Sequence, residues 1–545
     1  MEVQGGFTSC RCKSPFCTEG MHSNLVLLVN AGNLQNMFFI IVFEFKNIKT
    51  KRKEESYMDK FFKITERGST MKAEIMGGLT TFFAMAYIVF VNPNQVAGEG
   101  VAGWLAQAMN NETVSTRLGQ VWNAVFVASI LAAVIGTLLM AFLANMPFAQ
   151  ACGMGLNSFF CTVFVAGACF GGMDVIEGYH AGMVIIFVSG LVFLVLSVTG
   201  AREYIAKAMP DCLKKAIPAG IGLYIAMIGM KNAGLIQDNP YTFVQFVDIH
   251  GAVNDARISG TDWKMIVVPA LVAFVGLLVI AVLEHYKVKG SVIISILIST
   301  VLYYLCMLTV PSFDLGAIGQ TFKDFGEVGI VGLFDGKAWS DAFTGAPVGG
   351  IFNAVMLIIT FCLVDMFDTI GTLYGTASQA GMLDENGDPV NVNKSMMCDS
   401  IATVAGAVLG TSTCTTFVES SSGVAAGART GFASAVTAVC FTLCLFLSPL
   451  ASIIPSAATA PALIYVGVLM MKSFAQIDMH DITVAVPAFL ALIMMPLTYS
   501  IANGIGIGAI AYVIIALFTG KYHKKDVVIT IIAALFVLKF IFVTM

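Results

Sequence analysis

The chain has 545 residues, of which 57% are hydrophobic and only 12% are charged, and its mean hydropathy is +0.83. Soluble domains carry about 25% charged residues, so this composition excludes an ordinary soluble protein and predicts an all-α, polytopic membrane protein. The net charge of −4 is small, and the sequence has no basic stripe with interleaved aromatic residues, which argues against nucleic acid as a partner.

The first 57 residues differ from the rest of the chain. Residues 24–45 are apolar, but polar side chains interrupt them, so they fit neither a signal peptide nor a membrane span. The charged run 51–55 ahead of Met58 can be encoded by a purine-rich stretch, as a bacterial ribosome-binding site translated in frame would be. We therefore expect residues 1–57 to be a mis-annotated or disordered extension. An intact mass that includes them would contradict this expectation.

Residues 58–545 are predicted to form one membrane transporter, because apolar segments of span length recur throughout them. A first repeat, about 74–309, has segments at 74–96, 121–144, 151–168, 181–199, 215–231, 264–283 and 290–309. A second repeat, about 351–519, has segments at 351–380, 399–410, 415–428, 431–450, 460–472, 482–499 and 503–519. A last apolar stretch, 526–543, is either an extra span or an interfacial helix.

Cationic residues predict the orientation of these segments, because cytoplasmic loops carry an excess of Lys and Arg. The loops predicted to lie outside, 97–120, 232–263 and 310–350, are long and hold few cations. The loops predicted to lie inside carry Lys60, Lys63, Arg67, Lys72, Arg202, Lys207, Lys214, Lys215, His285, Lys287, Lys289, Lys394, Arg429, Lys472, Lys521, Lys524 and Lys525. We therefore expect a multi-pass protein of the cytoplasmic (inner) membrane, with the N-terminus and the end of the fourteenth span in the cytoplasm.

Seven spans in each half would give the halves opposite orientations. Weak internal similarity agrees, since residues 222–231 resemble residues 463–472, although chance similarity between apolar segments is the alternative for so short a match. A 7+7 inverted repeat is a transporter architecture, with the substrate site near the midplane at broken helices.

Two segments look like such broken helices. Residues 150–160 place glycines and Asn157 at membrane depth, and residues 410–423 place hydroxyls and Glu419 there. This composition favours a short extended stretch followed by a half-helix, which is tolerated only where it is buried in protein or lines a cavity. The serines at 420–422 either contact a ligand or serve in capping and helix packing.

Asp365 and Asp368 lie one helical turn apart, so both face nearly the same way. Each ionisable group costs roughly 2.5–3.5 kcal/mol at the centre of a membrane helix. A structural pair or a helix-end charge is the alternative to a binding role. With Glu419 they make three acids without an adjacent cation, which fits a bound proton, cation or ligand N–H group. The chain shows no nucleophile–base motif, phosphate loop or metal-ligand spacing, and the cluster Cys10, Cys12 and Cys17 is weak evidence for a metal. No enzyme, cofactor or metal is expected.

The motifs at 78–93, 153–160, 364–373 and 413–431 resemble those of the adenine/guanine/hypoxanthine permeases, a branch of the nucleobase:cation symporter superfamily. The resemblance covers residues 58–545. It implies proton-coupled purine uptake on the uracil-permease-like fold of fourteen spans, with a core and a gate domain. Met85-Ala86-Tyr87 stands where the xanthine and ascorbate branch has a Gln/Asn-His pair, which argues against that branch.

By the same resemblance, Asp368 and Glu419 would bind the base, and Asp365 and Asn157 would shape the site or its proton coupling. The candidate substrate-binding residues are Asp368, Glu419, Asn157, Phe417, Thr369 and Ser420, and the candidates for proton coupling are Asp365, Asp368 and Glu419. An aromatic face suits a planar base, although packing in the core or against lipid is the alternative for any one of 41 phenylalanines.

The expected partners are a purine nucleobase, a proton and the lipid bilayer; a homodimer is compatible with the sequence, which does not decide the oligomeric state. Guanine presents N1–H beside an amine, hypoxanthine keeps only N1–H, and adenine has an acceptor at N1, so the sequence does not choose among them. The alternatives are another substrate on the same fold, such as uracil or an inorganic anion, and a channel or receptor. An anion carrier would need a basic residue at its site.

Overall fold

The computed structural model describes residues 57–98, 112–201, 205, 208–239, 242–259, 263–311, 316–345, 350–380, 382–383 and 389–542, together with four short strands before residue 44. The chain divides into two compact units, Met1–Lys60 and Phe61–Met545. The first unit has two antiparallel strand pairs, β1 (Val3–Gln4) with β2 (Phe7–Thr8) and β3 (Leu25–Leu28) with β4 (Ile40–Phe43). The three cysteines of the N-terminal cluster and the cations Arg202 and Lys207 lie outside the described residues.

The second unit is helical, and its first half follows the predicted segments in order. Its elements are α2 (Met71–Met85), α3 (Ile88–Ala97), α5 (Glu112–Leu139), β5 (Gln150–Cys152), α6 (Met154–Phe160), α7 (Gly167–Phe170), α8 (Val175–Val198), α10 (Asp211–Asn232), α12 (Lys264–His285) and α13 (Ser291–Met307). Helix α1 (Tyr57–Phe62) precedes them. The connection between α10 and α12 contains the β6 (Ile236–Asn239) and β7 (Phe243–Phe246) hairpin and α11 (Ile249–Ser259).

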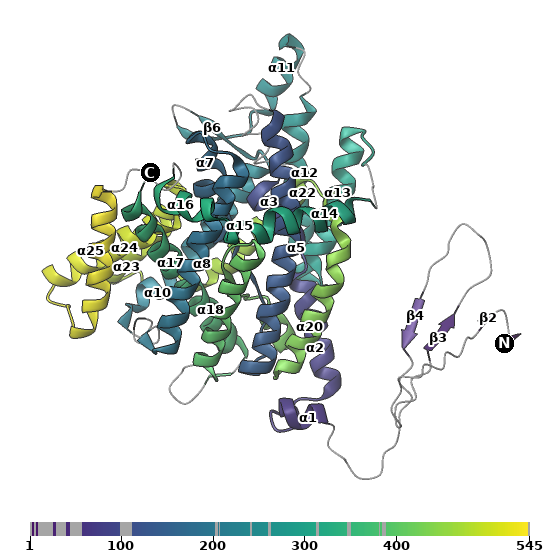
Figure 1. The fold of residues 1–545 in the computed structure, drawn as a ribbon, viewed down its shortest axis with the longest axis horizontal. Coiled ribbons are helices and arrows are strands. Elements are labelled where there is room, and N and C mark those ends of the chain that lie inside the picture. The colour runs from purple at the N-terminus through teal and green to yellow at the C-terminus, as the bar shows by residue number, and fades with distance from the viewer. Residues whose placement is uncertain are drawn as a thin grey trace. The chain divides into compact units, whose positions relative to one another are not determined.

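The second half begins after three short helices that the sequence does not predict. These are α14 (Ala317–Asp324), α15 (Val331–Phe334) and α16 (Gly336–Thr344). The half then has α17 (Ile351–Ala380), α18 (Val392–Leu409), β8 (Cys414–Thr416), α19 (Ser420–Ala425), α20 (Gly431–Leu443), α21 (Ser448–Ala451), α22 (Ser456–Met470), α23 (Ile482–Leu497) and α24 (Ile501–Phe518). Helix α25 (Val527–Phe542) follows, next to α23 and α24 (Figure 1).

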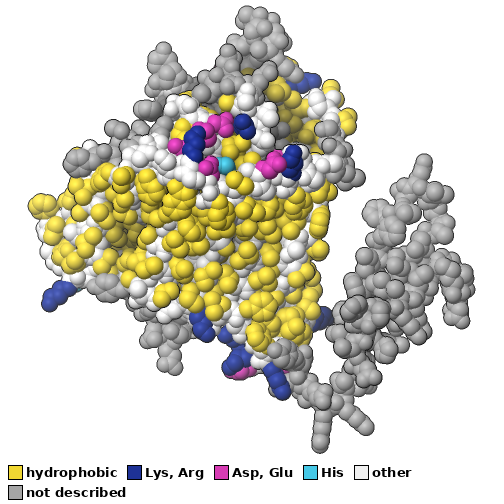
Figure 2. Space-filling view, in the orientation of Figure 1, with side chains coloured by type: hydrophobic (Ala, Val, Ile, Leu, Met, Phe, Trp, Pro, Cys, Tyr) yellow, Lys and Arg dark blue, Asp and Glu magenta, His cyan; other side chains and the backbone are white. Residues whose placement is uncertain are grey.

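Nine of the described helices are long and apolar enough to cross a membrane, and three shorter apolar helices, at 154–170, 291–307 and 482–497, accompany them. Hydrophobic side chains cover the visible face as a broad band, with charged side chains gathered at both margins (Figure 2). This pattern confirms the all-α polytopic membrane fold. Fourteen crossings remain a prediction, because α18 and the short half-helix at α19 are not among these twelve helices.

Several boundaries differ from the sequence expectation. Helix α18 begins at Val392 rather than at residue 399, because Asp399 is fully buried and hydrogen-bonded inside the protein and does not end the helix. Helix α5 begins at Glu112 rather than at residue 121. The apolar residues of the sequence predict the centre of a span, but they do not reveal a polar first turn of the same helix.

The two segments expected to be broken helices meet as an antiparallel strand pair. β5 pairs with β8 in the register Gln150↔Thr416, Ala151↔Thr415 and Cys152↔Cys414. Each strand leads into a half-helix, β5 into α6 and β8 into α19. Both strands are fully buried, so pairing satisfies backbone groups that could not meet water at this depth. The predicted extended stretches are therefore confirmed.

The two segments whose similarity suggests an internal repeat lie in α10 and in the end of α22 with the two residues after it, and α10 and α22 pack against each other. Gly222 and Gly467 make the contact: a methyl group on Gly467 would lie 2.5 Å from the carbonyl oxygen of Gly222. Glycine is needed here because the backbones approach closely, as small residues allow in membrane helices.

Candidate functional site

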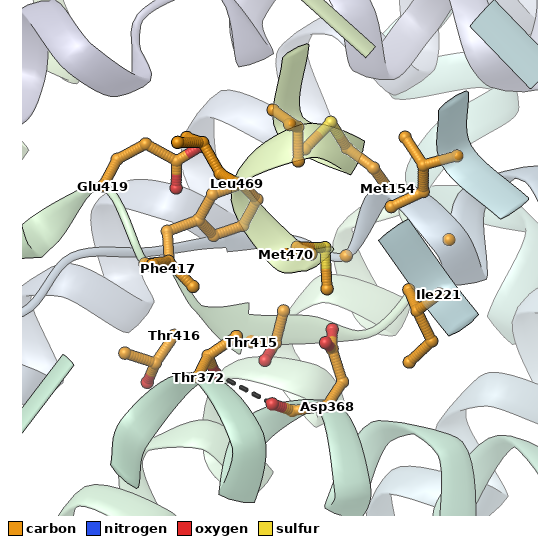
Figure 3. A pocket seen from close by; sticks show the side chains of 15 residues that line it. Met154, Ile221, Asp368, Thr372, Thr415, Thr416, Phe417, Glu419, Leu469 and Met470 are labelled. Carbon is orange, nitrogen blue, oxygen red and sulfur yellow. Dashed lines mark hydrogen bonds between the residues drawn. The ribbon is translucent and has the colours of Figure 1, made fainter. Parts of the chain in front are cut away.

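A cavity of about 40 Å³ lies where the two half-helices meet. It is lined by Gly153, Met154 and Gly155 of the first broken segment, by Thr415 to Glu419 of the second, by Asp368 and Thr372 of α17, by Ile221 and Ile225 of α10, and by Val466, Leu469 and Met470 of α22. The two acids lie on opposite sides of this space, with Phe417, Leu469 and Met470 around it (Figure 3).

Asp368 occupies the α17 side of the cavity and is 8% exposed. Its backbone carbonyl accepts a hydrogen bond from Thr372 Oγ1 at 2.9 Å, as Figure 3 shows. A methyl group on Gly153 would lie 3.7 Å from Asp368 Oδ2, so this carboxyl group sits beside the start of α6. The positive end of a helix dipole stabilises negative charge nearby, and Gly153 leaves room between the acid and the backbone.

Glu419 immediately precedes α19 on the other side of the cavity. Its Oε1 accepts a hydrogen bond from Tyr87 Oη at 2.6 Å. Tyr87 is fully buried between α2 and α3, which fixes the position of its hydroxyl group. One carboxylate oxygen of Glu419 is thereby occupied by the protein, and the group faces the cavity with acceptor capacity remaining.

Asp365 is buried one turn before Asp368 but is not among the residues that line the cavity. Its Oδ2 accepts a hydrogen bond from Thr403 Oγ1 at 3.0 Å. The same hydroxyl group contacts the backbone of Cys414, accepting from its N–H at 3.0 Å. Asp365 therefore ties α17 and α18 to strand β8 from behind the cavity.

Thr369 also lies behind the cavity, fully buried. Its hydroxyl group donates to Asp399 Oδ2 and lies 3.1 Å from Thr415 Oγ1. Asp399 Oδ1 accepts a hydrogen bond from Gln150 Nε2 at 3.3 Å. Asp399 of α18 thus binds α17 and strand β5 directly, and Thr369 links it to strand β8.

Asn157 and Ser420 are buried in the walls of the site and do not line the cavity. Asn157 Nδ2 donates to Asn92 Oδ1 at 3.0 Å, and Asn157 Oδ1 accepts from Ser412 Oγ. Ser420 Oγ accepts from the backbone N–H of Ala149 at 3.0 Å. Of the sequence-predicted residues, the structure brings Asp368, Phe417 and Glu419 together in the cavity and places the other four around it.

Several participating residues are absent from the candidates chosen from the sequence, and Asp399 and Tyr87 matter most because they contact candidate residues directly. Asp399 falls at the expected start of a span, where an acid looks like an ordinary helix-end charge, although it is buried as deeply as Asp365. Tyr87 stands in the expected first span, where one aromatic residue is unremarkable among many. Of these two, only Asp399 carried a usable signal, as an acid at the edge of an apolar segment.

A second cavity of about 450 Å³ adjoins the first, with Val418, Glu419, Val466 and Leu469 lining both. Its other walls include Thr80, Ala84 and Tyr87 of the first span, residues 287–290 between α12 and α13, and the first two residues of α13. Lys287, Lys289 and Lys472 also line it. The larger cavity therefore connects Glu419 with the end of the molecule where these lysines lie.

Residues 72–507 match the Permease family. The chain belongs to this permease family. It is 40% identical to the guanine/hypoxanthine permease PbuG of Bacillus subtilis over 488 residues, which cover 89% of this chain and 100% of that protein. It is 34% identical to the adenine permease AdeP of Escherichia coli over 494 residues, 91% of this chain and 98% of that protein.

Among solved structures, the permease resembles the transmembrane domain of a cyanobacterial bicarbonate transporter, BicA, with a TM-score of 0.50 and 14% identity over 81% of this chain and 97% of that one. This likeness concerns the fold alone, the predicted inverted-repeat transporter architecture. Family membership makes the chain a transporter and not an enzyme. Within the described residues, no group of three His, Cys, Asp or Glu side chains is arranged to hold a metal ion.

Proposed function

We propose that this permease takes up purine nucleobases across the cytoplasmic membrane, coupled to the entry of protons. The observation that carries the proposal is the pairing of Asp368 and Glu419 across one cavity whose lining, within the described residues, includes no Lys or Arg. A neutral planar ligand with N–H donors suits such a site, since carboxylate groups are strong acceptors. The relatives named as guanine/hypoxanthine and adenine permeases support the choice of a purine.

Asp368 and Glu419 bind the base in this proposal, and Phe417 offers an aromatic face to it. Asn157, Thr369 and Ser420 act from the walls by holding the half-helices and α17 in place. Two carboxylates that share a mostly apolar cavity repel each other when both are charged. A proton on one of them relieves this repulsion, so proton binding and base binding favour each other. Asp365, which supports β8 behind Asp368, belongs to the same coupling.

Transport of an inorganic anion is the second candidate, because the fold is shared with a bicarbonate transporter. The lining of the small cavity argues against it, since two acids without a cation repel an anion. The sequence relatives, which are far more similar to this chain than that transporter is, point the same way.

Uptake of radiolabelled hypoxanthine, guanine, adenine and uracil into purine-permease-deficient bacteria that express the full chain tests the proposal. We expect saturable uptake of at least one purine that collapses when a protonophore is added. A protein that reaches the membrane and takes up uracil, or no base at all, would refute the purine assignment. Purine uptake that is insensitive to the protonophore would refute proton coupling alone.

A further inference from the structure

The larger cavity has a chemistry that a neutral purine does not need. Its inner end is formed by Glu419 and its contact Tyr87, and its mouth carries Lys287, Lys289 and Lys472. Among the described residues, Glu284 is the only other acid in its lining, so the lysines exceed the acid at the mouth. An excess of positive charge around an enclosed space attracts an anion.

The lysine side chains are available to such a ligand. Within the part of the chain that the structure describes, none of the three forms an ion pair with a carboxylate. Lys289 Nζ donates to Thr80 Oγ1 at 3.0 Å and retains two further N–H donors. Glu284 forms no ion pair with a lysine among the described residues, and its Oε1 accepts a hydrogen bond from Ser291 Oγ, so this one carboxylate balances at most one of the three lysine charges.

The distance between the two ends of the cavity follows from contacts that both ends make with the first span. Lys289 contacts Thr80, and Glu419 contacts Tyr87 seven residues further along the same span. At 1.5 Å rise per residue, the lysine end and the carboxyl end are separated by roughly 10 Å. This separation is close to the length of an extended purine nucleoside 5′-monophosphate from its base to its phosphate group.

We infer that a purine nucleoside 5′-monophosphate binds in this cavity from the lysine-bearing end, with its phosphate group at Lys287, Lys289 and Lys472 and its base directed toward Glu419. The inference rests on the proposed function, because the base end of the ligand uses the acceptor assigned to an imported purine. Attachment of a phosphoribosyl group to an imported base gives such a nucleotide. A bound nucleotide occupies the route to the base site, and so it inhibits transport when the cytoplasmic supply is high.

Competition for base binding tests the inference. The purified full chain in phosphatidylcholine nanodiscs binds radiolabelled hypoxanthine, and inosine 5′-monophosphate, inosine, ribose 5-phosphate and inorganic phosphate are added as competitors. We expect the monophosphate to compete at least about 10-fold better than inosine, since charge-assisted hydrogen bonds contribute most of the difference. This advantage should disappear in a Lys287→Gln/Lys472→Gln variant whose hypoxanthine affinity is unchanged.

Lys394→Gln is the matched control, because Lys394 is an exposed lysine in the first turn of α18 that lines neither cavity. It should keep the full advantage of the monophosphate. Absence of hypoxanthine binding would contradict the proposed function itself. Normal hypoxanthine binding with equal competition by the monophosphate and inosine would overturn the nucleotide inference alone.

Two further outcomes would also overturn the inference. Inorganic phosphate or ribose 5-phosphate can match the nucleotide only if the base end plays no part in binding, so equal competition by either one contradicts a nucleotide site. Loss of competition when phosphatidylglycerol is added to the nanodiscs would show that the lysines serve lipid headgroups instead.

Discussion

Tyr87 is the residue that connects the first span with the acid of the second half. Its hydroxyl group donates to Glu419 Oε1 at 2.6 Å, and the ring is held by complete burial. The bond leaves Glu419 with a fixed direction toward the cavity. A carboxylate on a half-helix that has no such anchor would sample several rotamers, at a cost in conformational entropy when a base binds.

Replacement Tyr87→Phe removes this hydroxyl group and keeps the ring. We expect a loss of about 1.5–3 kcal/mol of interaction with the acid, which corresponds to roughly a 10-fold or greater fall in kcat/KM for purine uptake. Initial uptake rates over a range of base concentrations measure the effect. Tyr304→Phe, which removes a hydroxyl bond to Ile453 O away from both cavities, is the control and should transport normally. Equal uptake by the two variants would refute the role of Tyr87.

Asp399→Asn tests the support behind the cavity. The acid accepts from Thr369 and from Gln150, and an amide must turn an N–H group toward one of these donors. A buried, unsatisfied donor costs about 1–3 kcal/mol, so we expect a lower melting temperature together with weakened transport. Thermal unfolding of the purified variant, beside purine uptake in cells, measures both. An unchanged melting temperature would show that the hydrogen bonds of Asp399 do not hold strands β5 and β8 in place.

The sequence predicts the cavity acids Asp368 and Glu419 because charges are costly in apolar segments and because the motifs around them resemble a known family. It could not show which polar residues line the cavity and which stand behind it. Thr369 and Asp368 are neighbours in sequence, yet only Asp368 lines the cavity. That division depends on helix rotation and on contacts between α17 and α18, which are not local properties of the sequence.

The half-helix α19 is positioned by close packing on α2. A methyl group on Gly423 would lie 2.0 Å from Thr81 Oγ1 and 2.6 Å from Gly77 O. Gly77 is equally constrained, with Gly423 O 2.9 Å from its would-be methyl group. This contact between the two helices brings Glu419 toward Tyr87, so glycine at 423 serves the site as well as the fold.

Gly423→Ala should therefore separate α19 from α2. Overpacking typically costs 1–3 kcal/mol, and we expect a melting temperature lower by several degrees and reduced purine uptake. Gly119→Ala is the matched control, since Gly119 lies in α5 with no atom within 4 Å of an added methyl group. Thermal unfolding measures the melting temperatures of both variants for this comparison. A Gly423→Ala protein as stable and active as the control would contradict the packing role.

Sequence reasoning locates most membrane helices, because apolarity over span length is a strong signal. It also finds both broken segments from their glycines and hydroxyl residues. Helices α14, α15 and α16 are not predicted, because they are short and lie between spans. The antiparallel register of β5 and β8 also escapes it, since pairing between residues about 260 positions apart has no local signature.

Charge is distributed unevenly between the two margins of the molecule. In Figure 2, Lys and Arg dominate the lower margin, near α1 and α2, whereas the upper margin mixes acids, bases and a histidine. The positive-inside rule predicts that the lower margin faces the cytoplasm. The basic mouth of the larger cavity would then face the cytoplasm.

Single cysteines test this orientation. Ser340→Cys in α16 should react with a membrane-impermeant maleimide added to intact cells, because that helix is expected outside. Lys525→Cys, after α24, should react only after the cells are opened. Both positions are exposed, and the parent protein corrects for its own cysteines. Labelling of Lys525→Cys in intact cells would overturn the predicted topology.

The most direct test of proton-coupled purine transport is hypoxanthine accumulation by the full chain in vesicles with an imposed pH gradient. Proton coupling predicts accumulation above the outside concentration when the outside is acidic, and none without a gradient. Asp368→Asn and Glu419→Gln should lose gradient-driven accumulation, while Asp478→Asn, at an exposed acid that lines neither cavity, should keep it. Accumulation that ignores the gradient, or that survives in both cavity variants, would contradict the account.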